Sequence, residues 1–267
     1  MKHALLLPPV GELSQASALA EAASAAERAG WDAVFVWDHV LRPAHEPQEI
    51  ADPWIAMAAM ALATSRVRIG PMVTPITRRR PIKLARETIT LDHLCGGRLT
   101  LGLGLGVDTS RELSGFGEVV DARRRGDRLD EGADLLAALW SGERVNFHGE
   151  HFLADGVTVL PRPLQVPRIP MWFAARGDAR RPVRRAARFD GLVPIEVDAL
   201  QLAEMLALVV EARGTLDGFD IAVRPRGRRV YEAFRELGAT WAFAETTAGD
   251  ADVMRFVSCA PTDVFAN

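Results

Sequence analysis

Eight short apolar runs alternate with eight longer segments along this chain of 267 residues. The short runs are rich in Val, Ile and Leu at consecutive positions, which is typical of parallel strands buried on both faces. The longer segments are rich in Ala, Leu and Arg and have the spacing of helices. The predicted strands cover residues 4–8, 33–38, 67–73, 98–106, 169–175, 190–196, 219–224 and 239–245. The predicted helices cover residues 14–29, 53–63, 81–94, 122–140, 179–189, 199–212, 227–237 and 250–257.

This alternation predicts an α/β fold with a parallel sheet and right-handed crossovers. Eight such units within residues 1–258 have the count of a single-domain (β/α)8 TIM barrel. An open, doubly wound sheet is the alternative. Between the fourth and fifth strands, residues 145–161 alternate in polarity around a Gly-containing turn, so a β-hairpin insert is predicted there. Residues 259–267 are expected to form a loose C-terminal tail.

Composition and charge narrow the classes of function. Apolar residues make up 48% and charged residues 25% of the chain, which are globular values. The net charge of −3 lacks the basic excess of a nucleic-acid-binding domain, so no nucleic acid is expected as a partner. The longest apolar run, residues 54–63, is far shorter than the ~20 residues of a membrane-spanning helix, so no membrane partner is expected.

Two further features predict the location of the protein. The two cysteines, Cys95 and Cys259, are too few for a disulfide scaffold, which favours a reducing compartment. The N-terminal segment has no apolar region of the length found in signal peptides. A soluble cytoplasmic protein is therefore the expectation.

Three glycines at two-residue spacing, Gly102, Gly104 and Gly106, lie in the fourth predicted strand. The dinucleotide-binding pattern G-x-G-x-x-G fails here, because the third glycine would have to stand at Val107. The spacing instead puts all three glycines on one face of a strand. Such a face allows either the approach of a flat ligand ring or tight packing against another segment inside the barrel. The pattern leaves both open.

Asp38 and His39 follow the second predicted strand, at the end where parallel barrels build their sites. The imidazole of His39 could act as a general acid or base near neutral pH, or it could be a polar residue with only structural partners. After the third strand, Arg78, Arg79 and Arg80 could bind anionic groups or form surface ion pairs.

A loop containing Arg176, Gly177 and Asp178 precedes the helix that follows the fifth strand. Backbone N–H groups at a helix N-terminus beside an Arg suit a phosphate group, although an ordinary connecting loop has the same composition. His148 and His151 lie in the predicted hairpin and lack the ligand number and helical spacing of a zinc site. No metal is therefore predicted.

These pieces in this order resemble the bacterial luciferase-like superfamily of flavin- and F420-dependent oxidoreductases. The resemblance covers about half of the chain, in residues 30–40, 67–106, 123–177 and 184–194. It implies a barrel with the cofactor ring at its C-terminal mouth and His39 as the catalytic, proton-moving residue. Thr74 and its neighbours, where the family often has a cis peptide, would support the ring, and Pro75 offers a proline explanation for such a bond. The cofactor-binding residues it implies are Asp38, Thr74, Gly102, Gly104, Gly106, Arg176, Gly177 and Asp178.

Two departures from the family pattern stand out. The chain is short and has no long insertion near the seventh strand, where larger members carry a mobile lid that shields the site from water. The loop at residues 174–182 also lacks the second glycine common in the family.

The main expectation from the resemblance is a monooxygenase that uses reduced FMN and oxygen on a small organic substrate. A separate reductase would supply the electrons, because no dinucleotide motif is present, and a homodimer is expected. The first alternative is an F420-dependent enzyme of hydride transfer, towards which the basic run at residues 78–80 points, since F420 has an acidic side chain. A non-catalytic flavin-binding barrel is the second alternative, and a metal-dependent barrel hydrolase is the third.

Overall fold

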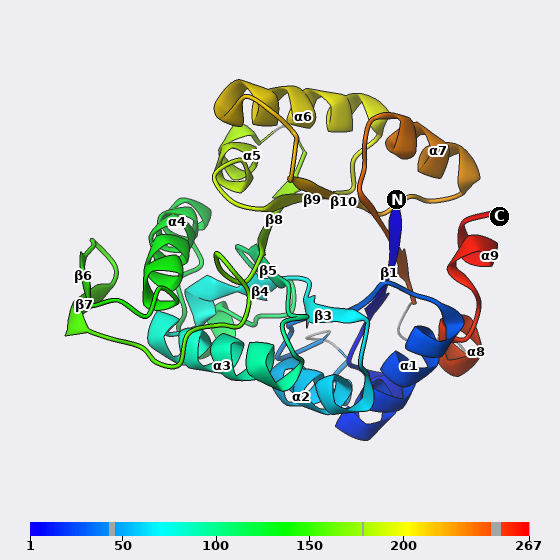
Figure 1. The fold of residues 1–267 in the computed structure, drawn as a ribbon, viewed down its shortest axis with the longest axis horizontal. Helices are drawn as coiled ribbons and strands as arrows, with labels where there is room; N and C mark the ends of the chain where they lie inside the picture. The colour runs from blue at the N-terminus through cyan, green and yellow to red at the C-terminus, as the bar shows by residue number, and fades with distance from the viewer. Residues whose placement is uncertain (43–45, 178, 247–251, 267) are drawn as a thin grey trace.

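A parallel sheet curls into a nearly closed barrel, with helices around its outside (Figure 1). The structure is a computed structural model that describes residues 1–42, 46–177, 179–246 and 252–266. The sheet runs in the order β3-β2-β1-β11-β10-β9-β8-β5-β4. Its strands are β1 (Lys2–Leu7), β2 (Ala33–Val36), β3 (Arg68–Pro71), β4 (Thr74–Pro75), β5 (Leu101–Gly104), β8 (Met171–Arg176), β9 (Gly191–Ile195), β10 (Asp220–Val223) and β11 (Trp241–Glu245).

The strands β3 and β4 are two pieces of one barrel strand, separated only by Met72 and Val73. β3 pairs with β2 on one side and β4 pairs with β5 on the other. A bridge between Ile69 and Leu99 adds a further link between these neighbours. Counted this way, the barrel has the eight strands predicted from the sequence, and the (β/α)8 architecture is confirmed.

Helices of different lengths cover the outside of the sheet (Figure 1). The bounds of α2 and α3 agree with the predicted ranges, because Pro53 and Pro81 each stand at the first helical position. Asp52 caps α2 by accepting hydrogen bonds from the backbone of Trp54 and Ile55. The helices are α1 (Ala16–Ala29), α2 (Pro53–Ala63), α3 (Pro81–Leu94), α4 (Ala122–Leu139), α5 (Arg180–Ala186), α6 (Ala199–Arg213), α7 (Arg228–Glu236), α8 (Val253–Val257) and α9 (Pro261–Ala266), with 3-10 turns η1 (Gly11–Leu13), η2 (Ile76–Arg78) and η3 (Ser114–Phe116).

The predicted hairpin insert is confirmed as the antiparallel pair β6 (Val145–His148) and β7 (Leu153–Val157). It projects beyond α4 at the edge of the molecule (Figure 1). The carboxylate of Glu131 on α4 accepts hydrogen bonds from the backbone of His151 and Phe152 in the hairpin turn. These bonds fix the insert against the barrel.

The expected loose tail was wrong for most of its length, because Pro261–Ala266 forms the helix α9. Phe265 lies 5.0 Å from the ring of His3 and 5.1 Å from the ring of Tyr231. This aromatic contact ties the end of the chain to β1 and α7. Residues 259–267 are too few to give a periodic pattern from which this docking could be predicted.

Two apolar cores flank the strands. The larger lies between the sheet and the helices, and the smaller fills the barrel interior. Alternate residues of each strand face inward, as in β11, where Trp241 and Phe243 belong to the interior core. None of the described helices is long and apolar enough to cross a membrane.

Candidate active site

His39 lies three residues beyond the end of β2, on the rim formed by the C-terminal ends of the strands. Its Nδ1 atom is 2.7 Å from Oε2 of Glu112, and its Nε2 atom is 3.2 Å from the guanidinium of Arg42. The side chain is 19% exposed, and its ring meets the ring of Trp37 edge-on at 5.8 Å between centroids. The histidine is therefore held on both nitrogens and still open to the mouth of the barrel.

The two partners of His39 determine which nitrogen carries the hydrogen. A guanidinium only donates hydrogen bonds, so Nε2 must be the acceptor facing Arg42. The hydrogen then belongs to Nδ1, which donates to the carboxylate of Glu112. This neutral tautomer presents a basic lone pair on Nε2, which is the state that a general base requires.

Glu112 is buried in the loop that follows β5, and its carboxylate also accepts hydrogen bonds from the backbone of Val40 and Leu41. Burial by itself raises the pKa of Glu112. The hydrogen bond from His39, the charge that its imidazole carries when protonated and the two backbone N–H groups together outweigh burial and lower that pKa below its usual value. Glu112 thus remains an anion that locks the segment bearing His39.

Sequence reasoning missed Glu112. The available signal was its position, since an acidic residue in the loop after a predicted barrel strand is a candidate for the site. The backbone of the preceding residue, Arg111, has a φ of 60°, a left-handed conformation that is uncommon for a residue other than glycine. That conformation is a local feature that composition does not reveal.

Asp38 lies in a buried group of protein partners, one of which, Arg78, also lies 3.8 Å from Glu112. The side chain of Asp38 is fully buried and pairs with Arg78 at 2.9 Å and with Arg79 at 2.8 Å. It also accepts hydrogen bonds from Thr74 Oγ1 at 2.8 Å and from Trp54 Nε1 at 3.2 Å. The structure therefore brings together two predicted cofactor-binding residues, Asp38 and Thr74, through a direct bond, and it places the cations of the basic run against Asp38.

The glycine face of β5 is covered by the neighbouring segment of the chain. A Cβ atom on Gly102 would lie 2.4 Å from the carbonyl oxygen of Pro71, and one on Gly104 would lie 2.5 Å from Val73 Cγ2. Gly106 has a φ of 72° and a similarly close neighbour in Pro75. The tight packing allowed by the sequence is therefore observed, and the approach of a cofactor ring to these glycines stays a prediction. The cis peptide joins Met72 to Val73 and does not involve Pro75.

Arg176 and Gly177 lie at the end of β8, separate from the cluster around His39. Arg176 is exposed and forms an ion pair with Glu196 at 3.1 Å, while Gly177 has a φ of 57°. The third residue of the predicted phosphate loop, Asp178, lies outside the described residues. The prediction of phosphate binding by this loop stays a prediction.

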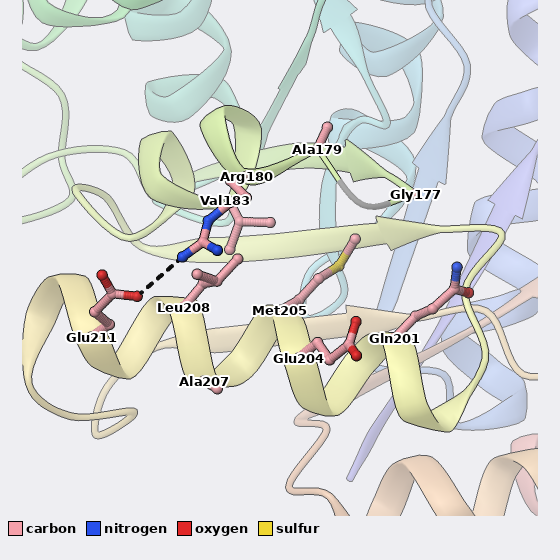
Figure 2. Close-up of a pocket in the computed structure, with 10 residues that line it drawn as sticks. All are labelled: Gly177, Ala179, Arg180, Val183, Gln201, Glu204, Met205, Ala207, Leu208 and Glu211. Atoms are coloured by element: carbon pink, nitrogen blue, oxygen red, sulfur yellow. Dashed lines mark ion pairs between the residues drawn. The ribbon is translucent and has the colours of Figure 1, made fainter.

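A cavity of about 450 Å³ opens between α5 and α6, with Gly177 at its lip (Figure 2). Val183, Met205 and Leu208 give it an apolar lining, and an ion pair of 3.5 Å joins Arg180 to Glu211. The cavity lies on the helix side of the sheet, whereas His39 faces the barrel mouth. We therefore place the candidate active site at the mouth and not in this cavity.

A second polar pair belongs to the mouth and was also missed from the sequence. Arg224 follows β10, and its guanidinium lies 2.6 Å from Oε2 of Glu245 at the end of β11. Burial raises the pKa of Glu245, and the charge of Arg224 and the nearby indole of Trp37 lower it to a smaller extent. Trp37 thus contacts His39 through its ring and lies near Glu245.

Known proteins share both the sequence pattern and the fold. Residues 4–260 match the family described as luciferase-like monooxygenase. An F420-dependent glucose-6-phosphate dehydrogenase of Beutenbergia cavernae is 34% identical over 260 residues, covering 89% of this chain and 74% of that protein.

Two solved structures with lower identity show the same fold. An F420-dependent secondary alcohol dehydrogenase in complex with an F420-acetone adduct has a TM-score of 0.83 at 19% identity, over 98% of this chain and 97% of that one. A monooxygenase from Streptomyces bottropensis has a TM-score of 0.70 at 24% identity, over 100% of this chain and 80% of that one. The family match extends over nearly the whole chain. This protein therefore belongs to the luciferase-like family of flavin- and F420-dependent oxidoreductases.

Proposed function

We propose that this protein is an F420-dependent dehydrogenase that interconverts an alcohol and a carbonyl compound, with His39 as the group that moves the proton. The FMN-dependent monooxygenase, which was the main expectation from the sequence, is the less well supported of the two. The relative from Beutenbergia cavernae, which aligns with 89% of this chain, is described as F420-dependent. The F420-dependent alcohol dehydrogenase also matches the fold over a larger share of its own length than the monooxygenase does.

The residues at the mouth have the chemistry that a deazaflavin ring needs. Val73 packs into the interior core beside Trp37, and both remain partly accessible, which provides an apolar surface for a flat ring. Polar groups of His39 and Arg42 stand next to that surface. Arg176, whose present partner Glu196 is itself exposed, would hold the cofactor phosphate. The basic run adds less than expected, because Arg78 and Arg79 are already paired with Asp38.

When bound, F420 supplies a two-electron hydride acceptor or donor without oxygen chemistry. In alcohol oxidation, the Nε2 lone pair of His39 takes the hydroxyl proton as the carbonyl forms. The positive charge that then develops on the imidazole faces the anion of Glu112, 2.7 Å from Nδ1. In the reverse direction, the same imidazole returns the proton to the carbonyl oxygen.

The guanidinium of Arg42 must move away from Nε2 of His39 before this nitrogen can accept the substrate proton. The guanidinium donates to Nε2 of His39 and lies over the ring of Trp37 at 5.0 Å. A substrate hydroxyl that replaces this donor gains the acceptor on His39 and leaves Arg42 free to bind the substrate oxygen from the other side. Arg42 is thus a positioning residue for the neutral tautomer in the absence of substrate.

The observation that carries the proposal is the His39–Glu112 pair on the barrel rim. The choice of cofactor is tested by titrating the purified protein with F420 and with FMN, each oxidised and reduced, and following fluorescence. We expect F420 to bind with a Kd below about 100 μM and FMN to bind more weakly. Tight binding of FMN alone would contradict the proposal, and failure of both to bind would remove the cofactor assignment altogether.

The phosphate assignment has a matched control within the chain. Arg176→Ala should weaken F420 binding by about tenfold, because it removes a charge-assisted hydrogen bond. Arg184 is exposed to a similar extent and forms an ion pair of 3.3 Å with Glu211 on the helix side of the sheet. Arg184→Ala should leave the Kd unchanged, and equal effects of the two substitutions would argue against a specific role of Arg176.

The expected partners are part of the same proposal. A separate F420 reductase would supply reduced cofactor where the reaction runs towards the alcohol. A homodimer would cover α2, whose 11 residues contain no charged side chain and leave Ile55 and Leu62 67% and 75% exposed. A helix that is apolar on all sides is usually covered.

A further inference from the structure

The Arg224–Glu245 pair sits in the part of the barrel that a substrate would reach. Side chains of β11 alternate, so Glu245 faces inward above Trp241 and Phe243, which are interior core residues. The register pairs Leu6 with Glu245 and also pairs Leu6 with Phe35. Glu245 is therefore level with the end of β2, from which Trp37 and His39 extend.

Stability alone gives little reason for a charged pair at this position. The side chains of Arg224 and Glu245 are 33% and 20% exposed, so both charges lose much of their hydration. The attraction between such partly buried charges is largely offset by this desolvation, and apolar residues of similar size would serve packing as well. The layers below the pair, which include Ala222 and Phe243, are apolar. A polar group on an otherwise apolar wall suits ligand recognition.

We propose that Arg224 and Glu245 form a substrate-recognition site that binds the hydroxyl groups of a neutral, polyhydroxylated alcohol, next to the hydroxyl that His39 deprotonates. This inference rests on the proposed function and adds the class of substrate to it. Trp37 lies near both places, since its ring meets His39 edge-on at 5.8 Å and its indole is close enough to lower the pKa of Glu245.

The chemistry of the pair favours neutral hydroxyl groups over anions. The carboxylate of Glu245 can accept hydrogen bonds from two hydroxyl groups, and the guanidinium of Arg224 can donate to their oxygens. The charge of Arg224 is paired with Glu245 at 2.6 Å, so a phosphate could bind this guanidinium only by displacing the carboxylate, although Arg226 and Arg42 add positive charge near Glu245.

The test compares the KM values of three alcohols in F420 reduction assays with the full-length protein. The probes are 2-propanol, which has one hydroxyl group, glucose, which is neutral and has several, and glucose 6-phosphate, which is anionic. We expect the wild-type protein to have its lowest KM for glucose. Glu245→Ala should raise the KM for glucose by at least about tenfold, because hydrogen bonds to a charged group are lost, and should change kcat much less. The KM for 2-propanol should change by less than about twofold, since 2-propanol has no second hydroxyl for the pair to bind.

Two variants separate recognition from a structural role. Glu245→Gln keeps the size of the side chain and part of its hydrogen-bonding capacity, so it should have a smaller effect on the KM for glucose than Glu245→Ala. Glu232→Gln removes an ion pair of the same 2.6 Å length on α7, outside the mouth, and should change no KM. Equal changes for glucose and 2-propanol in Glu245→Ala would mean a structural role and overturn the inference.

The remaining outcomes distinguish this inference from the proposed function. Turnover of 2-propanol without turnover of glucose overturns the inference and leaves the F420-dependent activity intact. A lower KM for glucose 6-phosphate than for glucose overturns the neutral substrate class. If the protein binds F420 but oxidises none of the probes, glucose is titrated into the F420 complex, and the absence of a Glu245-dependent fluorescence change overturns the inference. Failure to bind F420 at all refutes the proposed function itself.

Discussion

Glu112 holds His39 through Nδ1 at 2.7 Å and at the same time binds the backbone of the two residues that follow it. One buried carboxylate therefore sets both the tautomer of the histidine and the path of the loop that bears it. The relationship joins the loop after β2 to the loop after β5, which lie 73 residues apart in the sequence.

Replacing either member of this pair should impair catalysis more than cofactor binding. His39→Ala removes the proton acceptor and should lower turnover at least about tenfold, with F420 affinity roughly unchanged. Glu112→Gln keeps the shape but loses the charge that stabilises the protonated imidazole, so kcat should fall by a similar factor. Steady-state kinetics and F420 titration of each variant check this. Unchanged turnover in His39→Ala would remove His39 from the mechanism.

The lowered pKa of Glu112 predicts how its contribution to stability depends on pH. A carboxyl whose pKa is lower in the folded state stabilises the protein above its unfolded pKa, and this contribution is lost as the pH falls through the folded pKa. The Tm of the wild type should thus exceed that of Glu112→Gln at pH 7 and converge with it below the usual range of a glutamate. Thermal unfolding of both proteins across acidic pH measures the difference. A gap that widens towards low pH would contradict the assignment.

Loss of the Asp38 carboxylate should destabilise the fold strongly. Asp38→Asn leaves the guanidinium groups of Arg78 and Arg79 without their buried anion, and breaking such a pair typically costs about 3 kcal/mol or more. Asp217→Asn, which changes an exposed loop residue, is the control and should lie within about 0.5 kcal/mol of the wild type. Urea unfolding compares the free energies of unfolding, and equal values would show that the buried cluster contributes little.

The contact between Gly104 and Val73 predicts that β5 cannot accept a side chain there. Gly104→Ala places a methyl group 2.5 Å from Val73 Cγ2 and should cost about 1–3 kcal/mol through overpacking. Gly115 is the matched control, because a Cβ there would meet Arg111 Cβ at 3.6 Å, an ordinary contact. Gly115→Ala should therefore be tolerated. Similar Tm values for the two variants would show that the segment at Val73 can shift to accommodate the methyl group at little cost in stability.

The apolar surface of α2 predicts dimerisation that a single charge should disrupt. Leu62→Glu introduces a charge at a side chain that is 75% exposed, so the folded subunit should keep its Tm while its mass in solution halves. Light scattering of the wild type and the variant measures this mass. A wild-type protein that is monomeric at micromolar concentration would refute the homodimer.

The barrel could be predicted because its information is local and repeated. Each strand is a short apolar run, and prolines and glycines mark many helix ends, such as Pro53, Pro81 and Gly30. The division of the third strand into β3 and β4 could not be predicted, because it depends on how the segment at Met72 packs against Gly102. The docking of α9 depends likewise on a contact between residues at opposite ends of the chain.

The site could be predicted only in part for the same reason. His39 stood out because its residue type and its position at a strand end are both visible in the sequence. Glu112 and Glu245 did not, because their importance comes from partners on other strands and from burial that only the fold creates. Asp38 shows the converse, since it was assigned to the cofactor by its position while the fold surrounds it with protein partners.

The close packing of Val73 over Gly104 has a practical consequence for anyone who wishes to reshape the mouth of the barrel. The glycines of β5 cannot be replaced by larger residues, because the neighbouring segment already occupies the space that a side chain would need. Val73 itself packs against the interior core from the two residues between β3 and β4, so its size can be altered without breaking the hydrogen bonds of a strand. Val73 is therefore a side chain that redesign can vary, whereas β5 beside it has to be kept as it is.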